Sequence, residues 1–288
     1  MGEFKYIEVQ KSRDLGQILN VSFSFMSQNI KNLGLCVLYI GGLPLLISIL
    51  YNVFVQWDSA FNIGFTGSIG SEFFITFLGS LIINIVTLIF ITLVPIVYIK
   101  IYIEKKSNDI SVNEVWERTY PLFFRVLLAQ ILVGIITVIA FFFLIIPGFY
   151  VAIVFSLVSV IIAVEEIGIS ESLGRSSRLI NGHWWFTFGL IFVITIITYA
   201  LSFVFQVPTL IASAVLPFIY KDADLLNESF WLLRVFSGFG QLSSFFYAFY
   251  TIGLTFHYFS LVEQKEATGL FNKIDALEGA NPKSDASL

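Results

Sequence analysis

Long apolar runs separated by short polar gaps dominate this chain. The six longest runs cover residues 33–55, 73–103, 123–146, 149–164, 184–207 and 235–262. A helix of about 20 apolar residues crosses the hydrocarbon core of a bilayer. We therefore predict an all-α, polytopic membrane protein in which the 288 residues form one membrane domain with six transmembrane helices. The polar tail, residues 263–288, is expected to be partly disordered.

Proline and glycine predict where these helices bend and end. Pro44 and Pro95 lie inside apolar runs and are candidate bends. Pro147 and Gly148 predict a tight turn between the third and fourth spans, and Pro208 predicts the end of the fifth.

The basic residues predict the orientation in the membrane. Of the 16 Lys and Arg residues, only Lys221 and Arg234 lie outside one alternating set of gaps. The others are Lys5, Lys11, Arg13, Lys31, Lys100, Lys105, Lys106, Arg118, Arg125, Arg175, Arg178, Lys265, Lys273 and Lys283. Short loops rich in Lys and Arg stay in the cytoplasm, so we expect both termini to be cytoplasmic.

The cytoplasmic segments before spans one, three and five each resemble an amphipathic helix. Asp14 is a plausible N-cap for the first, and Ser111 with Glu114 forms a capping box for the second. The third begins near Ser170 and continues through Leu179. This pattern predicts three cytoplasmic surface helices and a weak threefold repeat. The alternative is that connectors close to a membrane are often amphipathic without any repeat.

The composition agrees with a membrane protein and narrows the chemistry. Only 12% of residues are charged and 57% are hydrophobic, against about 25% charged in soluble domains. The single cysteine, Cys36, excludes an intramolecular disulfide and a cysteine-based metal site. We expect no metal, no cofactor and no nucleic-acid surface, because neither ligand spacing nor a phosphate loop is present. The first thirty residues lack a signal-peptide pattern, so we expect the first span to be retained.

Polar residues inside the runs are uncharged. Asn84, Gln130 and Gln241 lie on polar helix faces, and we hypothesise that they meet in the centre of the bundle. Such amides most often bond neighbouring helices, and the alternative is a polar path or a cavity for a lipid headgroup. The absence of charge at mid-depth disfavours ion-coupled transport.

Glu165 and Glu166 form an acidic pair at the end of the fourth run. Adjacent helical residues point about 100° apart, so the two carboxylates are poorly placed to act on one substrate atom. We expect them to pair with Arg175 or Arg178 of the following surface helix and to fix its angle. Binding of a lipid headgroup by these four residues is the alternative.

A family resemblance rests on three stretches, Pro147–Tyr150, Glu165–Glu166 and Glu171–Trp185, the last reading ESLGRSSRLINGHWW. They resemble the YciC-like proteins and the membrane domain beside some glycerophosphodiester phosphodiesterases, a group of poorly characterised bacterial integral membrane proteins. Ser172 departs from the group, which usually has Ala there. The resemblance implies a helical protein of the bacterial inner membrane. It implies no established activity, because the phosphodiesterase chemistry belongs to a separate soluble domain.

Two functional classes stay open. The favoured one is a non-enzymatic accessory protein whose cytoplasmic face binds membrane lipids or another membrane protein. The alternative is a transporter or lipid-translocating protein that uses the polar helix faces. An enzyme ranks third, because no catalytic constellation can be assembled, and the oligomeric state stays open.

Overall fold

The computed structural model describes residues 6–56, 71–219 and 223–267. This part of the chain is helical and contains no strand. Six helical stretches in it are long and apolar enough to cross a membrane, which confirms the predicted fold class. They are Leu15–Val55, Phe73–Lys105, Val112–Phe143, Ile145–Glu165, Trp184–Val215 and Trp231–Glu266.

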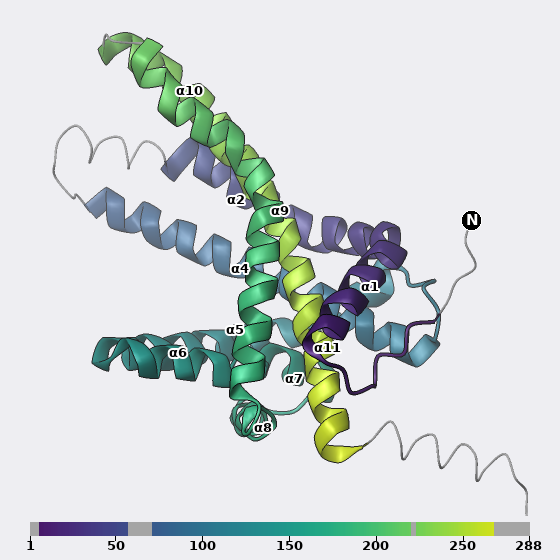
Figure 1. Cartoon of the computed structure of the whole chain (residues 1–288). Coiled ribbons are helices and arrows are strands. Elements are labelled where there is room, and N and C mark those ends of the chain that lie inside the picture. The colour runs from purple at the N-terminus through teal and green to yellow at the C-terminus, as the bar shows by residue number, and fades with distance from the viewer. Residues whose placement is uncertain (1–5, 57–70, 220–222, 268–288) are drawn as a thin grey trace, which may run out of the picture.

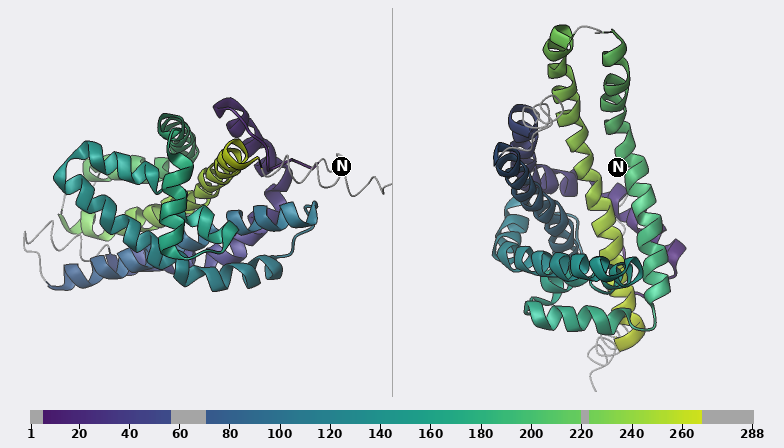
Figure 2. Two further views of the ribbon diagram at one scale, coloured as in Figure 1. Left: turned by 90° about the horizontal axis from the view of Figure 1, so that it is seen from below. Right: turned by 90° about the vertical axis from the view of Figure 1, so that its left-hand side faces the viewer.

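The first span is longer than predicted. α1 (Leu15–Cys36) is followed by a π-helical stretch, Val37–Gly41, by α2 (Gly42–Tyr51) and by a second π-helical stretch, Asn52–Gln56. The predicted cap is present, since the Asp14 side chain accepts a hydrogen bond from the Gln17 amide at 2.7 Å. α1 and α2 run in different directions (Figures 1 and 2), and π-helical stretches are a recognised cause of such bends. The surface helix predicted before this span is therefore joined to it.

α4 (Ser71–Lys105) crosses the centre of the molecule. Its 35 residues correspond to about 52 Å, well beyond the roughly 30 Å of a hydrocarbon core, and the helix continues through Pro95. Its second half supplies much of the core, with Leu93, Tyr98 and Tyr102 fully buried.

The third and fourth spans turn three residues earlier than predicted. α5 (Val112–Phe143) ends before the extended residue Leu144, and α6 (Ile145–Val154) starts directly after it. Pro147 and Gly148 therefore lie in the first turn of α6. The backbone N–H groups of a first turn have no partner within the helix, so the N–H that proline lacks costs no helical hydrogen bond there. A Cβ atom at Gly148 would lie 2.3 Å from Cγ of Phe141, so a larger residue there requires the Phe141 ring to move.

The fourth span is broken, and only one predicted surface helix is separate. After α6, the chain turns through residues 155–157 and continues as α7 (Val158–Glu165). α8 (Ile169–Ile180) is a separate amphipathic helix, as predicted. The helix predicted before the third span is the beginning of α5, with Ser111 as its N-cap. α5 continues unbroken through Pro121, so no separate surface helix forms.

The predicted end of the fifth span is wrong, whereas the sixth predicted span lies within the helical stretch Trp231–Glu266. α9 (Trp184–Ile219) continues past Pro208, and α10 (Ala223–Gly240) returns beside it. Neighbouring helices make an internal proline tolerable in a membrane span, and here the Thr209 hydroxyl bonds the Phe236 carbonyl of α10 at 2.8 Å. The chain then forms a 3₁₀ segment, Gln241–Phe246, and α11 (Tyr247–Glu266). Most of the tail predicted to be disordered lies outside the described residues.

The helices converge at one end and diverge at the other. The N-terminal segment, α8 and the end of α11 lie at the convergent end, while the α5–α6 and α9–α10 hairpins project away from it in different directions (Figures 1 and 2). The backbone amide of Arg13 donates to the Ser260 hydroxyl at 2.9 Å, so the two ends of the described chain meet there. We call the convergent end the terminal face and the opposite end the outer end.

Candidate functional site

Charged side chains join three helices at the terminal face. The Arg175 guanidinium of α8 bonds Glu165 at the end of α7, with 2.9 Å between Nε and Oε1. The same guanidinium holds both carboxylate oxygens of Glu266 in α11, with 2.9 Å between Nη2 and Oε2. The Tyr258 hydroxyl donates to Glu165 at 2.6 Å. We call Glu165, Arg175, Tyr258 and Glu266 the Arg175 cluster.

The pattern of α8 places Arg175 at this junction. Its inner side buries Ser172, Ser176, Leu179 and Ile180, and the Ser176 hydroxyl donates to the Val154 carbonyl at 2.6 Å. Arg175 lies beside this buried strip with 19% of its side chain exposed. The hydrogen bond with Glu266, followed by the interactions with Glu165, raises the pKa of Arg175, so its charge is firmly held.

A second charged junction joins α4, α5 and α7. Glu166 ends α7 in the left-handed region, with a φ of 57°. Its carboxylate lies 2.5 Å from Nζ of Lys100, and its carbonyl accepts a bond from Arg125 at 2.8 Å. The hydrogen bond from Lys100, reinforced by that residue's charge, lowers the pKa of Glu166.

The N-terminal segment closes the terminal face. Arg13 is 9% exposed, donates to the Val9 carbonyl at 2.9 Å, and lies over the Phe256 ring at 5.6 Å from its centroid. The amide of Ile7 donates to the Tyr102 hydroxyl at 2.8 Å. This short polar segment has no apolar periodicity. The sequence alone therefore does not predict that the segment is ordered.

The four acidic and basic residues singled out in the sequence have different surroundings. Glu165 lies against Arg175, but Glu166 bonds Lys100 rather than an arginine of α8. The Arg178 side chain is exposed and forms no ion pair with a described residue, while its carbonyl accepts a bond from Lys265 at 2.6 Å. Reasoning from the sequence missed Lys100, Tyr258 and Glu266. Their distance along the chain from residues 165–175 leaves no local signal.

The three amides predicted to meet in the bundle centre do not do so. The Ser48 hydroxyl bonds Asn84 at 3.3 Å and Gln241 at 2.8 Å, which joins α2, α4 and the 3₁₀ segment. Gln130 instead donates to the Ser159 hydroxyl of α7. Gln130 is exposed because α5 lies at the edge of the bundle, where only part of its circumference is covered.

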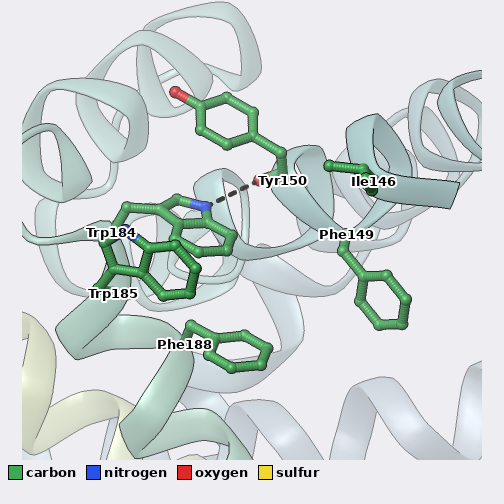
Figure 3. Close-up of a pocket in the computed structure, with 6 residues that line it drawn as sticks. All are labelled: Ile146, Phe149, Tyr150, Trp184, Trp185 and Phe188. Carbon is green, nitrogen blue, oxygen red and sulfur yellow. Dashed lines mark hydrogen bonds between the residues drawn. The ribbon is translucent and has the colours of Figure 1, made fainter. Parts of the chain in front are cut away.

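An open aromatic groove lies between α6 and α9. Ile146, Phe149 and Tyr150 form one wall, and Trp184, Trp185 and Phe188 form the other, around a volume of about 510 Å³ (Figure 3). The Trp184 ring stacks on Tyr150 with 5.7 Å between centroids. Its Nε1 atom donates to the Tyr150 carbonyl at 3.4 Å. We call these six residues the aromatic groove.

The polar groups of these sites bond mainly to one another and join neighbouring helices. Within the described residues, no group of three or more His, Cys, Asp or Glu side chains could hold a metal ion. The Glu165 carboxylate accepts hydrogen bonds from both Arg175 and Tyr258, so it joins α7 to α8 and α11. The buried ring of His257 bonds Thr187 at 2.9 Å, away from any carboxylate partner in the described structure.

Comparison with protein-family models, with curated proteins and with solved structures gives no match.

Proposed function

We propose that this chain is a non-enzymatic accessory protein of a bacterial inner membrane that binds anionic lipid. In this proposal the terminal face is cytoplasmic, and both termini lie there. The observation that carries it is the placement of α8. This amphipathic helix is fixed against the bundle by the Arg175 cluster and leaves Arg178 exposed.

The two arginines of α8 have different tasks in this proposal. Arg175 is occupied by two carboxylates, so its charge is neutralised within the protein. Arg178 is exposed, with no ion-pair partner among the described residues. A guanidinium binds phosphate oxygens through two parallel hydrogen bonds. A basic residue near an anionic membrane surface contributes about 1 kcal/mol to attraction. Arg178 is therefore suited to a phospholipid headgroup.

Two further considerations support the proposal. Three carboxylates of the terminal face, those of Glu165, Glu166 and Glu266, are held in ion pairs, which suits anchoring rather than acid–base chemistry. The resemblance to the YciC-like proteins also favours an inner-membrane protein. Another membrane protein docked on α8 is the competing occupant of the same surface.

Native mass spectrometry tests the headgroup proposal. The protein in mild detergent is titrated with phosphatidylglycerol and, separately, with phosphatidylcholine. We expect preferential binding of phosphatidylglycerol, and we expect Arg178→Gln to abolish the preference. Lys31→Gln changes an exposed basic residue of α1 and is the matched control, which should retain it. Equal binding of the two lipids by the unmodified protein would refute the proposal.

The alternative is a transporter or lipid-translocating protein. Its support is the polar junction of Ser48, Asn84 and Gln241 within the spans. Gln241 is the first residue of a 3₁₀ segment that interrupts the sixth span, so polar side chains and irregular backbone lie together there. Proteoliposomes containing a fluorescent phospholipid test it. Faster lipid exchange between leaflets that Gln241→Leu suppresses would favour this alternative, and an unchanged rate would remove it.

A further inference from the structure

We propose that the aromatic groove binds one acyl chain of a phospholipid whose anionic headgroup lies at Arg178. The inference rests on the proposed function and adds to it a second, apolar site with its own ligand chemistry. The lipid tail would fill the space between the α5–α6 hairpin and α9.

The chemistry of the groove selects a hydrocarbon chain. Its volume of about 510 Å³ falls within the roughly 300–1,000 Å³ typical of small-ligand sites. The six lining side chains are aliphatic or aromatic, and the indole N–H of Trp184 is already bonded to the Tyr150 carbonyl. Both walls belong to candidate membrane spans, so the surrounding solvent is lipid. A headgroup placed there would lose its hydrogen bonds to water, whereas an acyl chain would lose none.

Ring contacts connect the two walls of this groove. Trp184 stacks on Tyr150 from one side, and Phe188 stacks on Trp184 at 5.5 Å with an angle of 5° between the rings. Trp185 meets Trp184 edge-on at 4.7 Å. Figure 3 shows the α6 and α9 side chains on facing sides of the groove.

The positive charge of Arg178 favours a lipid with an anionic headgroup. α8 ends at Ile180, and Trp184 of the groove follows four residues later. Arg178 lies in the last turn of α8, and Lys265 bonds the carbonyls of Arg178 and Asn181 in this connection. Arg178 and Trp184 are six residues apart, so their Cα atoms lie within about 20 Å of each other, and one phospholipid can extend from the guanidinium to the groove. The pairing of a cationic residue with an apolar groove matches an anionic phospholipid.

Photo-crosslinking tests the inference directly. The full chain is reconstituted in phosphatidylcholine vesicles containing a phosphatidylglycerol with a diazirine in its acyl chain, and adducts are mapped by mass spectrometry. We expect adducts to concentrate on Phe149, Tyr150 and Phe188. Trp185→Ala removes one of the three side chains of the α9 wall, and this variant should lose most of the labelling. Tyr199→Ala, at a residue of α9 that is exposed to a similar extent and lies outside the groove, should keep it.

The outcomes separate this site from the headgroup site. Labelling spread evenly over exposed span residues such as Phe74 and Phe203 would overturn the acyl-chain site. Labelling of the groove by the phosphatidylcholine analogue, equal to that by phosphatidylglycerol and unchanged in Arg178→Gln, would overturn the headgroup assignment and leave the tail site standing. Melting curves of both alanine variants confirm that folding is retained.

Discussion

The two ends of α4 illustrate how differently the two ends of the molecule are built. Near the terminal face, Leu93, Tyr98 and Tyr102 are completely buried. Near the outer end of the same helix, Phe74 and Ile75 are more than half exposed. α9 repeats the contrast, because Leu190 and Ile194 are buried whereas Phe203 and Val204 face outward. The terminal half therefore has a protein core, and the outer half uses lipid as its solvent.

Polar interactions follow the same division. Five ion pairs between described residues connect α4, α5, α7, α8 and α11 near the terminal face. Towards the outer end, neutral side chains also join helices, as in the bonds from Ser48 to Asn84 and Gln241. We infer that most of the stabilising free energy lies in the terminal half, while the outer hairpins adapt to the surrounding lipid.

The largest predicted effect is the loss of Arg175. Arg175→Ala leaves Glu165 and Glu266 without their cation, and because these side chains are partly buried we expect a loss of about 2–3 kcal/mol, between the costs for exposed and fully buried pairs. Reversible SDS unfolding measures the change. Arg178→Ala on the same helix is the control and should stay within about 0.5 kcal/mol of the parent protein. Equal effects of the two changes would contradict the assigned roles.

A matched pair of glycines compares the two halves directly. A Cβ at Gly253 would lie 2.4 Å from Cδ1 of the buried Ile194, and a Cβ at Gly148 would lie 2.3 Å from Cγ of Phe141. Gly253→Ala should cost about 1–3 kcal/mol, because a packed core cannot absorb the methyl group. Gly148→Ala should cost less, since Phe141 is 37% exposed and can rotate into lipid.

Gly134→Ala is the control for both glycines, because no atom lies within 4 Å of its Cβ position. The same SDS titration applies. A larger loss for Gly148→Ala than for Gly253→Ala would reverse the comparison.

The outer polar junction should contribute modestly. Ser48→Ala removes the hydroxyl that bonds Asn84 and Gln241, and hydrogen bonds between membrane helices average about 0.6 kcal/mol. The midpoint of SDS unfolding should therefore shift only slightly. A loss as large as that of Arg175→Ala would show that the outer half is not adaptable.

The smallest effect concerns pH and the Lys100–Glu166 pair. The pKa of Glu166 is lowered below its ordinary value of 4.5, so the pair stabilises the protein above that pH and loses its contribution as the pH falls further. Glu166 is 63% exposed, so the effect is expected to be small. Melting temperatures of the parent and Lys100→Gln should differ at pH 7 and converge in acid. A difference that grows in acid would have the wrong sign.

Local patterns predict the spans of this protein but not their ends. Apolar runs indicate six spans, and Asp14 indicates the start of α1, because each signal is contained in a few neighbouring residues. Pro147 and Pro208 mislead, since the cost of a proline depends on its position in the helix and on the neighbouring helices.

The same limit applies to the site. The approach of Arg175 to Glu165 follows from a short connection between two helices. The third partner, Glu266, is brought in by the packing of α11, 91 residues further along the chain. Gln130 lies apart from Asn84 and Gln241 and bonds Ser159, and its polar character alone does not reveal which side of α5 faces lipid.

Distances between spin labels test the central contrast most directly. In a Cys36→Ala background, one labelled pair replaces Lys106 and Ser177 near the terminal face, and the other replaces Phe142 and Val204 in the outer half. Double electron–electron resonance, measured in nanodiscs whose bilayers have two different thicknesses, gives the distance distribution of each pair. We predict a narrow, unchanged distribution for the first pair and a broad one that shifts with thickness for the second. Two equally narrow and unchanged distributions would contradict a rigid terminal half joined to adaptable outer hairpins.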